Sequence, residues 1–306
     1  MSVIVVGSMA FDAIETPFGK SDKIVGGAAT YIAWCASNFT KVKQISVVGY
    51  DFPQDELNAL QARGVSLDAV EIKKNEKSFF WSGKYHMDMN SRDTLVTELN
   101  VLEHFKPIVP DSYQDVEFVM LGNLQPSVQM SVINQLKHRP KLIAIDTMNL
   151  WMDIALDDLK AVLKKVDVLM INDSEARQLS GDYSLVRAAR TIMEMGPRFL
   201  IIKKGEHGAL LFHEDKVFFA PALPLEEVFD PTGAGDTFAG GFIGHLAKTK
   251  DISFENMKTA IIVGSAMASF AVEKFGTERL REVTKDEIAE RLQQFVQLVN
   301  FDIDLV

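Results

Sequence analysis

Short apolar runs alternate with stretches of helical periodicity along much of the chain. This alternating pattern restricts the possible folds more than any other feature of the sequence. Four runs read as buried strands, at Phe118–Leu121, Leu142–Ile145, Val168–Ile171 and Phe199–Ile202, and Val3–Val6 is a similar run near the start. Continuous apolar strands separated by helices are typical of a parallel sheet with helices on both faces. The sequence therefore predicts an α/β fold with a doubly wound, mostly parallel sheet.

The last third of the chain departs from this alternation. Ala209–Phe212 and Val217–Phe219 flank a short turn and predict a hairpin at the sheet edge, and helical patterns alone follow at about 234–249, 254–273 and 285–299. In open α/β sheets, ligands bind beyond the carboxyl ends of the strands, so we expect the functional site there. These ends carry Gly7, Asp146, Asn172 and Lys203.

Residues from about 66 to 105 show little helical periodicity. They contain an aromatic, strand-like run at Ser78–Tyr85, followed by the polar stretch His86–Thr97. A structureless loop of this length is unusual in a compact domain. We therefore expect these residues, together with about 12–26, to form a small β-sheet lid on a single α/β domain that spans residues 1–306.

Composition narrows the class of partner. The chain carries 32 Lys and Arg against 42 Asp and Glu, a formal net charge of −10, and a surface this acidic repels nucleic acid and anionic lipid. The longest mostly apolar stretch, Thr259–Val272, is too short to span a bilayer, and the N-terminus does not read as a signal peptide. The single cysteine, Cys35, lies among apolar residues and is interpreted as a buried structural thiol. We expect a cytoplasmic protein with a small-molecule ligand, and neither nucleic acid nor a membrane as partner.

The most informative motif is Asp-Pro-Thr-Gly-Ala-Gly-Asp, from Asp230 to Asp236. Gly233, Ala234 and Gly235 carry almost no side chain, so their N–H groups can lie bare at a helix start and bind an anion. Asp236 falls in the first helical turn, where the helix dipole favours an ionised carboxylate. The alternative is a purely structural tight loop. The chain lacks the glycine spacing of both a Walker A loop and a dinucleotide fingerprint.

The pattern Asp-x-Thr-Gly-Ala-Gly-Asp-x-Phe resembles the C-terminal signature of the ribokinase-like (PfkB) family of carbohydrate and nucleoside kinases. The resemblance extends over nearly the whole chain, and the further matching motifs are Gly26-Gly27, Val48-Gly49-x-Asp51, Asn172-x-x-Glu175, Gly205-x-x-Gly208 and Gly276. It implies a doubly wound α/β domain with a small β lid, in agreement with the pattern above.

The resemblance implies an ATP- and Mg²⁺-dependent kinase that phosphorylates a hydroxyl, expected to be primary. Asp236 matches the family's catalytic base, which takes the proton of the acceptor hydroxyl. Gly233, Ala234 and Gly235 match the anion hole for the transferring phosphoryl group, and Thr232 precedes them on the nucleotide side.

Further nucleotide-side residues follow from the resemblance. Asn172 and Glu175 match the residues that organise Mg²⁺ through water, although the same spacing also predicts a helix capping box. Lys203 stands where many members have Thr, so a hydroxyl contact is replaced by a charge that can lie beside the phosphates, or by a solvated lysine. Gly205 leaves room for the nucleotide. Asp230 matches a loop that holds a monovalent cation in some members, so K⁺ is a possible activator.

On the acceptor side, Asp12 matches an Asp that binds sugar hydroxyls, and Gly26 and Gly27 allow backbone to approach the acceptor. Tyr31 replaces an Asn found in many sugar kinases and is expected to stack on a flat group. Phe11, Phe79 and Trp81 lie in or near the lid, where aromatic residues more often pack the lid than contact a ligand. Together with Tyr31 they nevertheless favour a nucleoside over a bare sugar. Asn90, Arg92 and Asp93 lie in the polar stretch that follows, where Arg92 is a candidate phosphate or sugar contact.

Several alternatives stay open at this point. A sugar-specific kinase resembling ribokinase or fructokinase is the nearest, and a non-catalytic ligand-binding protein on the same fold is the next. A nicotinamide-dependent oxidoreductase is disfavoured because the fingerprint is missing. A homodimer formed through the lid is expected, since an exposed sheet edge seeks a partner.

Overall fold

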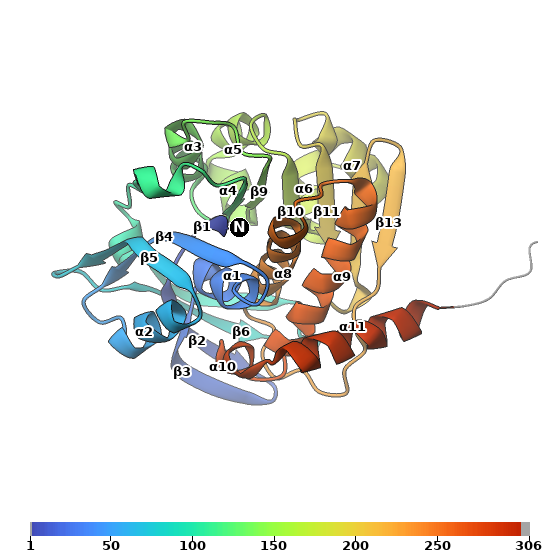
Figure 1. The fold of residues 1–306 in the computed structure, drawn as a ribbon. Helices are drawn as coiled ribbons and strands as arrows, with labels where there is room; N and C mark the ends of the chain where they lie inside the picture. Colours follow the sequence, from blue (N-terminus) through green and yellow to red (C-terminus); the bar gives the residue numbers. More distant parts are fainter. Residues whose placement is uncertain (1, 301–306) are drawn as a thin grey trace, which may run out of the picture.

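The computed structural model describes residues 2–300 and contains one large and one small sheet (Figure 1). The strands of the large sheet are β1 (Ser2–Val6), β4 (Lys41–Gly49), β5 (Val65–Lys73), β8 (Phe118–Leu121), β9 (Leu142–Asp146), β10 (Val168–Asn172), β11 (Phe199–Lys203), β12 (Ala209–His213) and β13 (Lys216–Ala220). Their order across the sheet is β13-β12-β11-β10-β9-β8-β1-β4-β5. Pairing is parallel from β11 to β5 and antiparallel for β12 and β13, so the predicted sheet and its edge hairpin are confirmed.

Helices cover both faces of the large sheet. One face carries α1 (Ala28–Ala36), α2 (Gln54–Ala62), α8 (Ala234–Thr249), α9 (Phe254–Ala271), α10 (Glu278–Glu282) and α11 (Lys285–Val299). The other carries α3 (Pro126–Gln135), α4 (Asn149–Ile154), α5 (Leu156–Leu163), α6 (Asp173–Ser180) and α7 (Leu185–Met193). Short 3₁₀ turns lie at Asn100–Leu102, Asp111–Tyr113 and Gly205–His207.

The strands are apolar throughout because alternate residues enter opposite cores. In β1, Val3 and Val5 belong to the core under α8, whereas Ile4 and Val6 belong to the core on the other face. A strand that alternates between two buried layers has no solvated face and shows no polar alternation. This packing explains why the strands are visible in the sequence as unbroken apolar runs.

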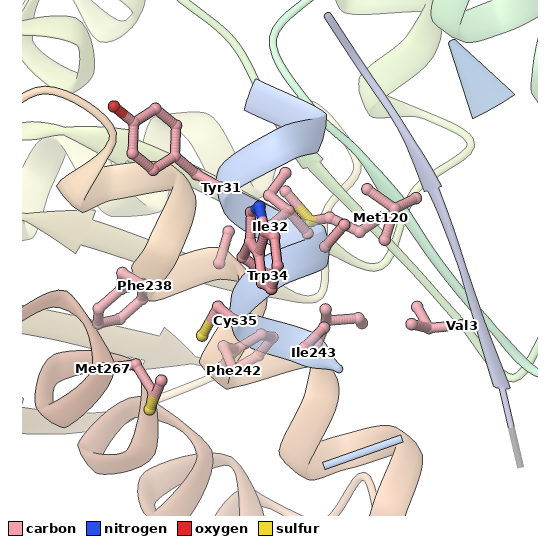
Figure 2. Packing of buried hydrophobic residues seen from close by; sticks show 14 of the residues in the cluster. Val3, Tyr31, Ile32, Trp34, Cys35, Met120, Phe238, Phe242, Ile243 and Met267 are labelled. Carbon is pink, nitrogen blue, oxygen red and sulfur yellow. The ribbon is translucent and has the colours of Figure 1, made fainter. Parts of the chain in front are cut away.

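Close packing of α1 against α8 positions the start of α8. Figure 2 shows Ile32 and Cys35 of α1 close to Phe238, Phe242 and Ile243 of α8. A Cβ at Gly240 would lie 2.7 Å from the Cys35 Cβ, so only glycine allows the helices to approach this closely. The thiol of Cys35 is fully buried, as expected for a structural cysteine.

The small sheet consists of β2 (Ala10–Thr16), β3 (Gly19–Gly26), β6 (Phe79–Tyr85) and β7 (Arg92–Glu98), in the order β3-β2-β6-β7. We call it the lid sheet. The expectation that 66–105 belongs to it was wrong at the start of the range, because β5 pairs with β4 in the large sheet. As an edge strand, β5 is half-exposed, and its polar residues obscured its membership of the large sheet.

Among residues 2–300, no helix combines the length and apolarity needed to cross a membrane. The long apolar stretch at Thr259–Val272 falls almost entirely within α9, which packs on α8 inside the larger core.

Candidate active site

The segment Pro231–Asp236, which we call the amide loop, offers free backbone N–H groups at the start of α8. Gly233 is the helix N-cap and has φ +75°, a left-handed conformation that glycine adopts at little cost. The N–H groups of Gly235 and Asp236 donate to no acceptor within residues 2–300, whereas that of Ala234 donates to the Pro231 carbonyl at 3.2 Å. The free amides stand at the positive end of the helix dipole, so the loop can bind an anion.

Tyr31 lies directly beneath this loop. A Cβ at Gly233 would come within 2.4 Å of the Tyr31 ring, which is only 1% exposed. The ring therefore has no free face, and the expectation that Tyr31 stacks on a flat ligand was wrong. Its hydroxyl points away from the packed residues of α1 (Figure 2) and has no hydrogen-bond partner in the described part of the chain.

Asp236 stands in the first turn of α8, at the third helical position. Burial and the nearby charge of Asp146 raise its pKa to about 7, while Lys203 and Arg92 act in the opposite direction. A carboxylate whose pKa lies near neutrality is suited to accept a proton during a reaction.

Lys203, at the end of β11, reaches the amide loop at Gly235. Its Nζ lies 3.3 Å from Asp146 Oδ2, and a Cβ at Gly235 would come within 3.1 Å of the same Nζ. Burial opposes the charge on Lys203, but the carboxylates of Asp146, Glu175 and Asp236 hold its pKa above the usual value. The ammonium group therefore stays charged beside the free amides.

Asn172 and Glu175 form the predicted capping box at the start of α6. The Asn172 N–H donates to Glu175 Oε2 at 2.7 Å, and the Glu175 N–H donates to Asn172 Oδ1 at 2.8 Å. Burial and the charge of Asp146 raise the pKa of Glu175 to about 7. The structural interpretation is thus confirmed, and it leaves Glu175 Oε1 without a hydrogen-bond donor among residues 2–300.

Gly205 follows β11 with φ +55° and lies under the connection between β6 and β7. A Cβ at this position would come within 2.1 Å of Asn90 Oδ1, so glycine is required by close approach as well as by conformation. Gly208, with φ +82°, then turns the chain into β12.

Asp12 of β2 approaches the same region from the lid sheet. A Cβ at Gly26 would lie 1.9 Å from Asp12 Oδ2, and Gly27 has φ +91° as the N-cap of α1. Burial raises the pKa of Asp12 to about 8, with further contributions from the charges of Asp230 and Asp236. The two glycines therefore make room for a carboxylate that faces the amide loop.

Asp230 ties this loop to a distant segment. Its carboxylate accepts hydrogen bonds from the Thr232 N–H at 2.8 Å and from the Gly276 N–H at 2.9 Å. Thr232 in turn donates its hydroxyl to the Tyr85 hydroxyl of the lid sheet, at 3.2 Å. Asp230 thus orders the loop, and Thr232 connects it to the lid.

The predicted residues come from five segments, 12, 26–31, 172–175, 203–205 and 230–236, and they lie around one region at the carboxyl edge of the large sheet. The stacking expected of Tyr31 is wrong, and the roles expected of the other residues stay predictions. Sequence reasoning missed Tyr85, whose strand pattern carries no functional signal, and treated Asp146 only as a strand end. Asp146 is the last residue of the buried strand β9. An acidic residue at the carboxyl end of a parallel strand could have marked it as a candidate site residue.

Three carboxyls with raised pKa values predict that stability falls between about pH 5 and pH 8. In the unfolded chain, Asp12, Glu175 and Asp236 lose their protons near the ordinary pKa values of 3.8 for Asp and 4.5 for Glu, whereas in the folded chain they keep them up to about pH 7 or 8. The folded state then binds more protons over this window, so the free energy of unfolding decreases as pH rises. We expect Tm to fall by at least about 5 °C, measured by thermal unfolding at constant ionic strength. Asp12→Asn, which cannot ionise, should reduce the fall, and a Tm that rises over this window would contradict the prediction.

Comparison with known proteins decides the family. The model of the pfkB family carbohydrate kinases matches residues 2–283. The chain belongs to the PfkB family. A cytidine kinase from Thermococcus kodakarensis is 28% identical over 292 residues, which cover 93% of this chain and 96% of that protein. The expectation of an ATP-dependent kinase is therefore confirmed for this PfkB-family protein.

Solved structures support the fold. The nucleoside kinase of Methanocaldococcus jannaschii, an archaeal member of the ribokinase family, superposes with a TM-score of 0.78 at 23% identity and covers 96% of this chain and 98% of its own. The ribokinase of Arabidopsis thaliana, solved with ribose and ATP, superposes with a TM-score of 0.75 at 20% identity and covers 95% of this chain and 98% of its own. The predicted ribokinase-like architecture is thus confirmed.

Proposed function

We propose that this PfkB-family kinase transfers the γ-phosphoryl group of ATP to a primary hydroxyl of a nucleoside. The observation that carries this proposal is the placement of the Asp236 carboxyl directly after the free amides of Gly235 and its neighbours, with Asp12 facing it from the lid sheet. A proton acceptor, an anion site and a hydroxyl-binding carboxylate then surround one small volume.

In the proposed reaction, Asp12 orients the acceptor hydroxyl and Asp236 takes its proton. The acceptor oxygen forms a bond to the γ-phosphorus, the bond from that phosphorus to the β–γ bridging oxygen breaks, and ADP leaves with the electron pair. The amides of Gly233 and Gly235 hold the charge of the transferring group, with Ala234 contributing backbone to the same loop. Burial of the carboxyl strengthens each of these electrostatic interactions.

Lys203 and Gly205 are proposed for the β-phosphate side of the nucleotide, with Thr232 at the edge of the amide loop. Glu175 fits a role in holding Mg²⁺ through water together with Asn172, because Glu175 Oε1 is free of hydrogen-bond donors among residues 2–300. The described residues contain no group of three acidic, His or Cys ligands, so Mg²⁺ would be held mainly by phosphate oxygens and water. When bound, Mg²⁺ neutralises charge on the phosphates.

A nucleoside acceptor is favoured by the inner face of the lid sheet. Asp12 pairs with Trp81 in the register of β2 and β6, so the two side chains are neighbours on one face. A carboxylate that can bind ribose hydroxyls beside an aromatic ring that can contact a base fits a nucleoside better than a bare sugar. The names of relatives, such as the cytidine kinase, agree with this choice. Gly26, Gly27 and the free hydroxyl of Tyr31 complete the proposed acceptor side.

Two further expectations stay predictions. Both carboxylate oxygens of Asp230 already accept backbone N–H groups, so K⁺ would have to use its remaining lone pairs. A homodimer through the lid is supported by Leu95 and Val96 of β7, which are 56% and 42% exposed.

An acceptor screen tests the proposed function. With ATP and Mg²⁺ in excess, pyrimidine and purine ribonucleosides, ribose, deoxyribose and hexoses are compared by ADP release and product mass. We expect a kcat/KM at least about 10²-fold higher for the best nucleoside than for free ribose, because only the nucleoside can use the aromatic part of the site. Preference for a free sugar would support the sugar-kinase alternative. Absence of phosphoryl transfer, with ligand binding retained, would support a non-catalytic binding protein.

A further inference from the structure

The tip of the hairpin between β6 and β7 is held by hydrogen bonds among its own residues. Asp88 accepts hydrogen bonds from the Asn90 N–H at 3.1 Å, the Ser91 N–H at 2.9 Å and the Ser91 hydroxyl at 2.6 Å. The Asn90 side-chain amide donates to the Asp88 carbonyl at 3.1 Å. Because the turn is held by its own side chains, it can present Asn90 in one orientation.

This tip joins the acceptor side of the site to the nucleotide side. Asn90 Oδ1 lies over Gly205, as the 2.1 Å approach of a Cβ there indicates. Five residues earlier, the Tyr85 hydroxyl accepts a hydrogen bond from Thr232 in the amide loop. The hairpin thus rests on both segments that we assign to the nucleotide phosphates.

Arg92 lies two residues after Asn90, at the start of β7. It pairs with Tyr85 in the register of β6 and β7, so both side chains share the inner face of the lid sheet. Its guanidinium stands 5.7 Å from the centre of the Trp81 ring. Within residues 2–300 it makes neither a hydrogen bond nor an ion pair, which leaves its planar fork of donors available.

The positive charge of Arg92 acts on carboxyls at both the acceptor side and the nucleotide side of the site. Burial raises the pKa values of Asp236 and Glu175, and in each case Arg92 is one of the cations that oppose the rise. The other cation is Lys203, which is already paired with Asp146. A triphosphate entering this acidic site therefore meets Lys203, which is already paired, and Arg92, which has no partner in the described part of the chain.

We propose that Arg92 binds the terminal phosphate of ATP and follows its charge during transfer, and that Asn90 positions the hairpin on Gly205 for this purpose. The inference rests on the proposed placement of the phosphates at the amide loop. A guanidinium donates two parallel hydrogen bonds to phosphate oxygens, which a compact ammonium cannot do. The lid sheet would then bind the terminal phosphate of the nucleotide as well as cover the acceptor.

Binding measurements separate this role from a structural one. Calorimetry with a non-hydrolysable ATP analogue and with ADP, each with Mg²⁺, gives the contribution of the terminal phosphate. We expect the wild type to bind the analogue about tenfold more tightly than ADP, and Arg92→Met, which keeps the aliphatic stem over Trp81, to lose this difference. Lys84→Met is the matched control, since Lys84 belongs to the same hairpin but points to the opposite face and pairs with Glu15 at 2.6 Å.

Kinetics give the second readout. Arg92→Met should lower kcat/KM for ATP by about 10²-fold and leave KM for the acceptor within about twofold, and Arg92→Lys should recover only part of the loss. Asn90→Ala should lower kcat/KM for ATP by less, because it removes the contact of Asn90 with Gly205 but leaves the charge of Arg92. The proposal is overturned if Arg92→Met keeps the preference for the ATP analogue, matches Lys84→Met, or raises only the acceptor KM. If the wild type binds neither nucleotide, the proposed function itself fails.

Discussion

Replacing Asp236 by Asn is expected to lower kcat by about 10³- to 10⁴-fold while nucleotide binding stays within a few-fold. The amide keeps the size of the side chain and its place in the first turn of α8, but it cannot accept the proton of the acceptor hydroxyl. The measurement is steady-state kinetics with the best acceptor, together with calorimetry of ADP binding.

Stability and pH provide the controls for this variant. Because the pKa of Asp236 is raised to about 7 by burial and by Asp146, removing its ionisation should keep or raise Tm at pH 8. The wild-type kcat/KM should rise with pH through about 7 as the carboxyl loses its proton, and the residual activity of the variant should lack this dependence. Asp286→Asn changes an exposed acid in the first turn of α11 and should leave the rate unchanged. Near-normal turnover of Asp236→Asn would exclude it as the base.

Replacing Gly235 by Ala is expected to reduce kcat/KM by about 10²- to 10³-fold without unfolding the protein. Position 235 is helical, so alanine fits the backbone, but its methyl group would lie 3.1 Å from Lys203 Nζ, where the transferring group is proposed to bind. Thermal unfolding and kinetics on the same preparation separate the two effects.

Gly233→Ala should behave differently because its defect is structural. The φ of +75° strains any L-residue, and the new Cβ would clash with the Tyr31 ring at 2.4 Å. A marked loss of Tm is therefore expected along with the loss of activity. Gly64→Ala is the matched control, since Gly64 also has a positive φ, of +87°, but no atom lies within 4 Å of its Cβ position.

A Gly235→Ala enzyme with wild-type rates would show that the amides do not hold the phosphoryl group.

Much of the large sheet could be predicted because its strands are buried on both faces. Runs such as Phe118–Leu121 and Val168–Ile171 have no polar alternation, and their bounds agree closely with β8 and β10. The helix predicted at 234–249 coincides with α8, since glycine and alanine mark its start. The edge strand β5 could not be recognised in the same way, because one side faces solvent and its pattern resembles that of the lid.

Tyr31 illustrates the limit of residue-type reasoning. An aromatic residue at a position associated with an acceptor contact suggests stacking, but the amide loop covers the ring, which is 1% exposed. Whether an aromatic face is free depends on a segment some 200 residues away in the chain, and no local pattern contains that information.

The sequence by itself determined the fold class, the family and the candidate base, because these depend on local periodicity and on one contiguous motif. Only the tertiary structure decided that Asp146 pairs with Lys203, that Tyr85 contacts Thr232, and that Arg92 lies beside the Trp81 ring with no ion pair among residues 2–300. It also decided that the buried carboxyls share one volume, which raises the pKa of Asp12 to about 8 and those of Glu175 and Asp236 to about 7. Charge coupling depends on distance in space and on burial, so it appears only when strands and loops far apart in the chain are packed together.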